Sequence, residues 1–216
     1  MSGRTPYEVP PLVAAARRAG VGDPRVLRAL AEVPRAAFVP RESAWLAEED
    51  RPIPIGRRQV TTQPSLVAAM VEALGLTGRE RVLEVGTGYG YQTAILAALA
   101  DTVWSIERFR ELAEAARANL AAAGVANAHV VVGDGSEGLP GHAPYDAVVV
   151  SAASPAVPAP LVEQLAIGGR LVHPVGPGGD ERVTLFERRP EGLVERRLVT
   201  YAIFVPFVGR HGLPEE

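Results

Sequence analysis

The chain of 216 residues contains no cysteine. This absence excludes disulfide bonds, metal sites that depend on thiolates, and a cysteine nucleophile. A chain of this length buries roughly seven-tenths of the surface that its unfolded form exposes, so it needs no crosslinks to fold. We therefore expect a core held together by apolar packing, and the lack of cysteine fits a reducing cytoplasm.

Long apolar runs and concentrated charge of one sign are also missing. The longest apolar stretches, such as 94–100 and 147–150, are far shorter than the ~20 residues of a membrane span. Residues 1–6 have no apolar run behind their single arginine, so no secretory signal is apparent. The 22 basic and 25 acidic residues are spread evenly, which argues against a nucleic-acid partner. We expect a cytoplasmic protein without membrane or nucleic-acid partners.

The N-terminal third is predicted to be mostly helical. Apolar residues recur at helical spacing over 10–20 and 24–33, which predicts two helices. Residues 51–64 are rich in Pro, Gly, Arg and Thr, and predict a long irregular connection of the kind that is often functional. A helix over 65–74 follows, with Gly75 near its C-terminal end.

From residue 81 onward, predicted strands and helices alternate. Strands are predicted over 81–85, 103–107, 128–132, 147–150 and 169–174, and helices over 92–99, 110–123 and 160–165. Strands with apolar residues on both faces are typical of a parallel sheet covered by helices on each side. Two further strands, 182–188 and 193–207, predict an antiparallel hairpin that extends the sheet. The fold class is α/β: a doubly wound, mostly parallel, Rossmann-like sheet with an N-terminal helical region and C-terminal antiparallel strands.

A glycine-rich turn follows the first of these strands. Gly86, Gly88 and Gly90 alternate after the acidic residue Glu84. Glycines allow a tight turn and a close approach of a ligand, which in such sheets binds beyond the carboxyl ends of the strands. A dinucleotide-binding fingerprint places its third glycine where Tyr91 stands. The alternating pattern resembles instead the first motif of class I S-adenosylmethionine methyltransferases, and the alternative is a turn that binds no ligand.

Two acidic residues further along support the binding of S-adenosylmethionine. Glu107 ends the second strand about 20 residues beyond the glycines, where a carboxylate can accept hydrogen bonds from both ribose hydroxyls. Asp134 follows the third strand, where it can accept from the adenine amino group. Each alone also fits a solvated carboxylate or a simple turn, but their order favours a cofactor site. The predicted cofactor-binding residues are Glu84, Gly86, Thr87, Gly88, Tyr89, Glu107, Arg108, Asp134 and Gly135.

Segments outside the glycine motif make most of the chain similar to the protein-L-isoaspartate (D-aspartate) O-methyltransferase family. These segments are 23–27, 33–35, 38–40, 51–64, 145–146, 152–153, 168–170, 174–176 and the Phe-Val-Pro sequence at 204–206. The resemblance implies methylation of the α-carboxylate of L-isoaspartyl residues in damaged proteins, after which the ester collapses to a succinimide without enzyme help. It implies isoaspartyl-containing proteins and peptides as partners, and we expect a monomer.

This chemistry needs neither a general base nor a metal. A carboxylate with a pKa of about 4 is already ionised at neutral pH. The enzyme mainly has to align it with the methyl group of a sulfonium, and such orientation supplies ~7–11 kcal/mol of barrier reduction. We expect no metal site, and we expect structural or exposed positions for the scattered histidines His129, His142, His173 and His211.

The segment 51–64 matches the family's active-site loop, with departures. By this match Thr62 takes the place of a serine that orients the substrate carboxylate, and Gln59, Thr61 and Val205 are implied substrate-binding residues. Alternatively, the two threonines only cap the following helix. The family usually has glycine at the position of Arg58, threonine at the position of Val60 and serine at the position of Thr62.

These departures leave other functions open. One is a carboxyl methyltransferase for one dedicated peptide partner, and another is a catalytically silent cofactor-binding protein. A methyltransferase for nucleic acids or small molecules is a further alternative, but residues 151–154, Ser-Ala-Ala-Ser, lack the signature of amino-group methylation of bases. We expect a single domain, in which 1–64 form the N-terminal helices and active-site loop, 65–180 the cofactor-binding core, and 181–216 a C-terminal hairpin and tail.

Overall fold

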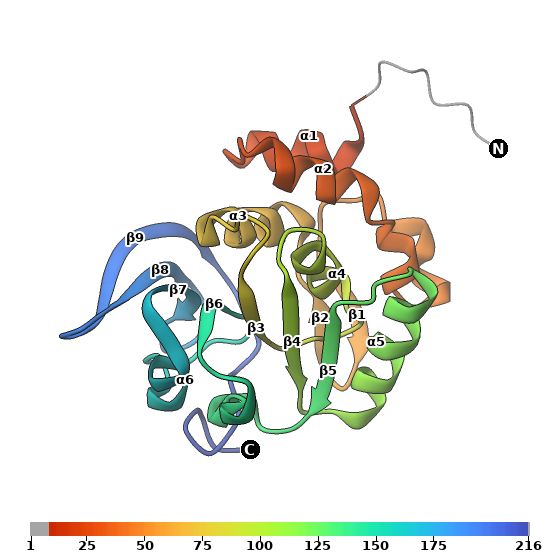
Figure 1. Cartoon of the computed structure of the whole chain (residues 1–216). Coiled ribbons are helices and arrows are strands. Elements are labelled where there is room, and N and C mark those ends of the chain that lie inside the picture. Colours follow the sequence, from red (N-terminus) through yellow and green to blue (C-terminus); the bar gives the residue numbers. More distant parts are fainter. Residues whose placement is uncertain (1–8, 216) are drawn as a thin grey trace.

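The computed structural model describes residues 9–215, and a seven-stranded sheet forms its centre (Figure 1). Residues 1–8, to which the expectation about a secretory signal applies, lie outside the described part. The strand order is β5-β4-β3-β6-β7-β8-β9, with β3 to β7 parallel and the last two strands antiparallel. The strands are β3 (Arg81–Val85), β4 (Thr102–Glu107), β5 (Ala128–Val132), β6 (Tyr145–Val150), β7 (Leu165–Val175), β8 (Glu181–Arg189) and β9 (Gly192–Ala202). The predicted fold class and the C-terminal extension of the sheet are confirmed.

Helices cover both faces of this sheet. They are α1 (Pro11–Arg18), α2 (Pro24–Glu32), α3 (Pro64–Leu74), α4 (Tyr91–Ala97), α5 (Arg110–Ala122) and α6 (Ala159–Gln164), with short 3-10 turns at Arg35–Phe38, Arg41–Leu46, Gly135–Glu137 and Pro140–His142. Adjacent residues of a strand point to opposite faces. In β3, Val82 belongs to the core beneath α1 to α4, whereas Leu83 belongs to the core shared with α6. Both side chains are fully buried, which explains why two consecutive residues of this strand are apolar.

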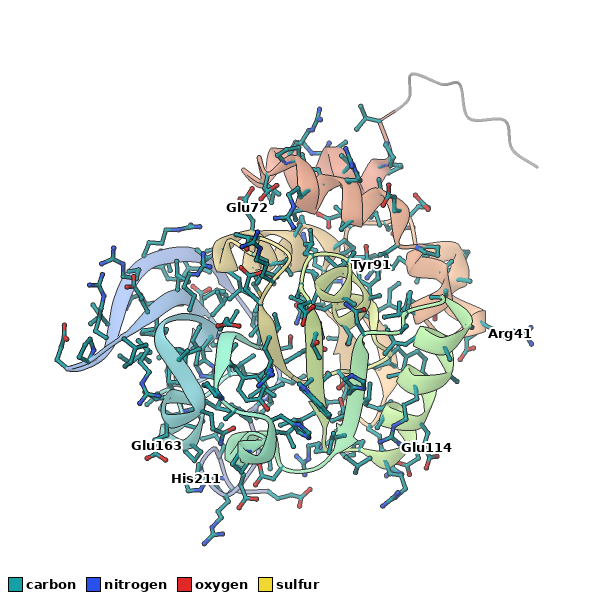
Figure 2. All side chains as sticks on the ribbon, in the orientation of Figure 1. Arg41, Glu72, Tyr91, Glu114, Glu163 and His211 are labelled. Atoms are coloured by element: carbon teal, nitrogen blue, oxygen red, sulfur yellow. The ribbon has the colours of Figure 1, made fainter. Side chains whose placement is uncertain are left out.

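The N-terminal helices are attached to α3 through Glu72, which reaches toward the turn between α1 and α2 (Figure 2). Its Oε1 accepts hydrogen bonds from the backbone N–H groups of Gly22, at 2.7 Å, and Asp23, at 2.6 Å. The Asp23 carboxylate in turn caps α2 by accepting from the N–H of Arg25 at 2.7 Å. No helix within residues 9–215 is long and apolar enough to cross a membrane.

The predicted irregular connection over 51–64 is wrong, because it contains an antiparallel hairpin of β1 (Ile53–Gly56) and β2 (Gln59–Thr61). Gly56 pairs with Gln59, so the turn has two central residues, Arg57 and Arg58, with φ of 51° and 57°. Turns of this type require positive φ at both central positions and usually contain Asn-Gly or Asp-Gly. An Arg-Arg pair gives no such signal, which is why the sequence did not reveal the hairpin.

The last strand, β9, ends at Ala202, and its predicted extension to residue 207 is also wrong. The chain leaves the sheet there and crosses to the loop after β6. The N–H of Ala153 donates to the carbonyl of Val205 at 2.8 Å, and the N–H of Phe207 donates to the carbonyl of Ala153 at 2.7 Å. These bonds bring Val205 to the carboxyl ends of the parallel strands.

The turn between α3 and β3 is organised around Glu80. Its carboxylate accepts hydrogen bonds from the N–H groups of Thr77, Gly78 and Arg79 and from the Thr77 hydroxyl. Burial opposes the ionisation of this carboxyl, but the hydrogen bonds outweigh it and lower the pKa of Glu80 from 4.5 to about 2. The ionised Glu80 therefore stabilises the fold.

We expect the substitution Glu80→Gln to lower the free energy of unfolding by about 1–3 kcal/mol at pH 7. The folded-state pKa lies below the unfolded one, so this stabilisation is present in full above pH 4.5 and is lost as the pH falls toward 2. Urea denaturation at pH 7 and pH 3 measures the effect, with Glu114→Gln on the exposed surface of α5 as the control. An equal loss at both pH values would contradict the assignment.

The hairpin turn gives a second stability prediction. The left-handed conformation costs a non-glycine residue roughly 1–2 kcal/mol, whereas glycine adds ~0.5–1 kcal/mol of unfolded-state entropy. We expect Arg58→Gly to raise the free energy of unfolding by about 0.5–1 kcal/mol, measured by urea denaturation. Arg197→Gly, at an exposed position of β9, is the control and should be destabilising. A similar loss of stability in both variants would show that the turn is not strained.

Candidate active site

The glycine motif forms the loop between β3 and α4. Gly86, Gly88 and Gly90 have φ of 94°, 55° and 92°, which lie in the left-handed region that favours glycine. A Cβ on Gly86 would lie 3.3 Å from the Cβ of Ser151, and one on Gly88 would lie 3.1 Å from the Cδ1 of Ile55. The alternating glycines are therefore required by both backbone conformation and close packing.

A buried carboxylate supports this loop from below. Glu84 is fully buried, and its oxygens accept hydrogen bonds from Gln92 Nε2 at 3.0 Å, Thr93 Oγ1 at 2.5 Å and Ser105 Oγ at 2.6 Å. Because the Ser105 hydroxyl donates to Glu84, it accepts the 2.5 Å hydrogen bond that joins it to Thr87 of the loop. Burial raises the pKa of Glu84 to about 7 against these hydrogen bonds. The structure thus places Glu84 beneath the predicted cofactor site, where it holds the loop in position.

Glu107 lies at the carboxyl end of β4 and faces the glycine loop. Its Oε2 accepts from the N–H of Gly88 at 2.9 Å, and its Oε1 accepts from the N–H of Phe109 at 3.0 Å. Burial raises the pKa of this carboxyl, and the backbone hydrogen bonds oppose the shift. Each carboxylate oxygen has two lone pairs, so Glu107 can still accept hydrogen bonds from a ligand.

Two cavities meet at Glu107. A small one of about 60 Å³ lies over the glycine loop and is lined by Gly86, Thr87, Gly88 and Tyr89. The other measures about 600 Å³, within the range of small-molecule sites. Its walls include Ile106, Glu107, Arg108, Phe109, Gly135, Phe207, Val208 and Leu213. The largely apolar walls, with the Glu107 carboxylate among them, suit a nucleoside.

Asp134, predicted to bind the adenine, lies beside this larger cavity but does not line it. Its Oδ1 accepts from the N–H of Ser136 at 2.9 Å and from the Ser136 hydroxyl at 2.7 Å, and its Oδ2 accepts from the N–H of Arg210 at 2.7 Å. It lines an adjoining cavity together with Arg108, which is paired with Glu215 of the C-terminal tail. The contribution of this tail to the cavity walls was not predicted from the sequence.

A groove of about 460 Å³ opens on the other side of the glycine loop, between α3 and residues 199–205. It contacts the small cavity along a shared border formed by Val60, Thr62, Ser151 and Val205. Exposed apolar side chains lie in and beside it, including Tyr201 and Ile203, which are 56% and 76% exposed. The groove therefore leads from the protein surface to the glycine loop.

The two adjacent threonines of the active-site loop face different surroundings. Thr61 is buried, and its Oγ1 accepts a hydrogen bond of 2.9 Å from Nη2 of Arg35. Arg35, also buried, donates to the carbonyl oxygens of Glu49 and Arg51, each at 2.7 Å, so it joins the N-terminal region to β2. Thr62 is half-buried and lines both the small cavity and the groove.

The alternative role of these threonines, capping of the next helix, is not what the structure shows. The N-cap residue of α3 is Gln63, with no side-chain capping bond. The N–H of Ser65 donates instead to the carboxylate of Asp50 at 2.8 Å. Gln59 and Val205, the other residues expected to bind substrate, line the small cavity together with Thr61 and Thr62.

Comparison with known proteins gives the family. The family model for protein-L-isoaspartate(D-aspartate) O-methyltransferase matches residues 8–212. The chain belongs to this family. It is 51% identical over 196 residues to the protein-L-isoaspartate O-methyltransferase of Methanoculleus marisnigri, covering 91% of this chain and 89% of that one. It is 48% identical over 205 residues to the Aeropyrum pernix protein of the same name, covering 93% of this chain and 79% of that one.

Solved structures share the fold of this methyltransferase family member. A protein-L-isoaspartate O-methyltransferase structure superposes with a TM-score of 0.81 at 30% identity, covering 93% of this chain and 66% of that one. A Plasmodium falciparum structure in complex with S-adenosyl-L-homocysteine has a TM-score of 0.78 at 20% identity, covering 92% of this chain and 97% of that one. The resemblance inferred from the sequence segments is confirmed.

Proposed function

We propose that this chain transfers a methyl group from S-adenosylmethionine to the α-carboxylate of L-isoaspartyl residues in damaged proteins, which initiates repair through a succinimide. The observation that carries the proposal is the shared border of the glycine-loop cavity and the surface groove at Thr62 and Val205. A protein carboxylate that enters by the groove meets the cofactor cavity at the residues that match the family's active site.

The cofactor cavities fit S-adenosylmethionine. The larger cavity has the size and apolar walls for the adenosine part, with Glu107 placed to accept hydrogen bonds from the ribose hydroxyls. The small cavity over Gly86, Thr87, Gly88 and Tyr89 would hold the methionine part. When bound, the cofactor supplies a methyl group on a positively charged sulfur. Glu84 contributes by holding the loop, Arg108 and Gly135 by lining the nucleoside cavity, and Asp134 by lining the cavity that adjoins it.

On the substrate side, Thr62 is the proposed donor to the carboxylate. It is half-buried at the border of the two cavities, and none of the hydrogen bonds between described residues uses its hydroxyl. Thr61 acts differently from the sequence-based expectation: because its hydroxyl is held by Arg35, it contributes to substrate binding through its backbone and by fixing Thr62. Gln59 and Val205 complete the wall, and Val60, 43% exposed, adds apolar surface that excludes water.

Relatives that are about half identical and named for isoaspartate favour general repair over a dedicated peptide partner or a silent binding protein. The evenly spread charge supports proteins and peptides as substrates over nucleic acids. We retain the expectation of a cytoplasmic monomer and of one domain.

Methyl transfer from labelled S-adenosylmethionine to a synthetic L-isoaspartyl peptide tests the function, with the ordinary aspartyl peptide as control. We expect base-labile label on the isoaspartyl peptide alone. Label on neither peptide, with cofactor binding intact, would reject the repair function.

The role of Thr62 is tested by a matched pair of variants. A hydrogen bond to a charged group contributes about 1.5–3 kcal/mol, so Thr62→Ala should lower kcat/KM for the isoaspartyl peptide about 10- to 100-fold. Thr62→Ser keeps the hydroxyl and should retain most of the activity. Steady-state kinetics with both variants measures this, and equal activity of Ala and Ser variants would exclude the hydroxyl from the reaction.

The role of Glu107 is tested by cofactor binding. We expect Glu107→Gln to raise the Kd for S-adenosylhomocysteine about 10- to 100-fold, because the amide is a weaker and less symmetric acceptor than the carboxylate. Isothermal titration calorimetry measures the Kd. The control is Glu114→Gln, at an exposed position of α5. An unchanged Kd in Glu107→Gln would remove this carboxylate from the cofactor site.

A further inference from the structure

Ser151, which directly follows β6, is held against the glycine loop. Its N–H donates to the carbonyl of Val85 at 2.9 Å, which continues the pairing of β3 and β6 by one residue. Its side chain packs so closely on Gly86 that a Cβ on that glycine would lie 3.3 Å from the Cβ of Ser151. The backbone and Cβ of Ser151 are therefore fixed beside the loop that faces the cofactor.

Ser151 lies where the described cavities converge. It and Val205 line the small cavity, the nucleoside cavity and the surface groove. Four residues form the border between the small cavity and the groove: Val60, Thr62, Ser151 and Val205. Of these four, only Thr62 and Ser151 have side chains that can donate a hydrogen bond. A carboxylate at this border therefore meets two hydroxyl groups and two apolar side chains.

The hydrogen bond beneath Ser151 makes its oxygen an acceptor and leaves its O–H available. Nε2 of Gln92 donates to Ser151 Oγ at 3.0 Å and to the Glu84 carboxylate at 3.0 Å. Glu84 also accepts from Thr93 and Ser105, so as a carboxylate it orients the Gln92 amide with its nitrogen toward Ser151. Ser151 Oγ thus accepts a hydrogen bond from Gln92. Its own O–H remains available to another acceptor, because no hydrogen bond within residues 9–215 uses it.

We propose that the Ser151 hydroxyl donates a hydrogen bond to the substrate carboxylate, as a second donor beside Thr62. This inference rests on the proposed function and deepens it, because it adds a catalytic residue to the same site. Two donors on one carboxylate fix both the position and the plane of the group, whereas one donor leaves it free to rotate. The free lone pair of the attacking oxygen can then be aligned with the bond from the methyl group to sulfur.

The reaction balances without a change in the protonation of Ser151. The attacking carboxylate oxygen forms a bond to the methyl carbon as the carbon–sulfur bond breaks. The electron pair of that bond stays on sulfur, which becomes a neutral thioether, and the carboxylate becomes a neutral ester. Ser151 keeps its proton throughout and only loses a charged acceptor when the ester forms. Its hydrogen bond therefore serves to orient the carboxylate.

Four variants test the proposal. Ser151→Ala removes the hydroxyl, and the pair Ser151→Thr and Ser151→Val compares side chains of the same shape with and without it. Ser154→Ala is the control, because the Ser154 hydroxyl is buried and bonds to His173 away from the cavities. The measurements are kcat/KM for an L-isoaspartyl peptide, the Kd for S-adenosylhomocysteine and the melting temperature.

We expect kcat/KM to fall about 10- to 100-fold in Ser151→Ala and to differ about as much between the Thr and Val variants. The Kd for S-adenosylhomocysteine should stay within about twofold of wild type, a change of under 0.5 kcal/mol. Ser154→Ala should lower the melting temperature and leave kcat/KM unchanged. Because the Thr and Val variants carry the same added bulk, their ratio reports on the hydroxyl even if both are less stable.

Four results would overturn the proposal. Equal kcat/KM in the Thr and Val variants, or wild-type activity in Ser151→Ala, would exclude the hydroxyl while leaving the repair function intact. A parallel loss of affinity for S-adenosylhomocysteine would assign Ser151 to the cofactor and not to the substrate. A wild-type chain that neither methylates nor binds the isoaspartyl peptide would reject the function and this inference together.

Discussion

The buried carboxylate of Glu84 is the constraint on which the site depends. It accepts hydrogen bonds from Gln92 and Thr93 of α4 and from Ser105 of β4, so it joins the strand before the glycine loop to the helix after it and to the next strand. A buried acceptor that loses its donors costs more than the hydrogen bonds contribute in net terms. These elements are therefore held in one arrangement, in which Gln92 also donates to the Ser151 oxygen and leaves the Ser151 O–H available.

A second hydrogen-bond network holds the segment around Thr61 and Thr62, which is the proposed substrate side of the site. The buried guanidinium of Arg35 bonds to two carbonyls of the loop before β1 and to the hydroxyl of Thr61. The guanidinium also lies over the ring of Tyr91 in α4, with its Cζ 5.8 Å from the ring centroid. Figure 2 shows Tyr91 beneath the N-terminal region. Arg35 thereby links the hairpin that carries Thr62 to the helix that follows the glycine loop. The N-terminal region is thus tied, through Arg35, to both the hairpin and α4.

Much of the fold could be predicted because its strands have covered faces. The run 81–85 is apolar enough to be read as a buried parallel strand, and the structure has β3 over the same residues. The hairpin could not be predicted, because Arg57 and Arg58 adopt left-handed conformations that arginine disfavours. Contacts with other parts of the chain hold the turn in this conformation. One such contact is the ion pair of Arg57 with Glu111 of α5, and tertiary contacts of this kind leave no local pattern.

The sequence by itself determined the sheet, the glycine loop, the position of Glu107 and the family, because each depends on residue types at fixed spacing along the chain. Only the tertiary structure decided which hydroxyl groups line the border between the small cavity and the groove. Thr61 and Thr62 are neighbours with similar side chains, yet one is held by Arg35 and the other faces the groove. Ser151 joins Thr62 there because parallel strands end at a common edge and because residues 203–207 cross back to that edge.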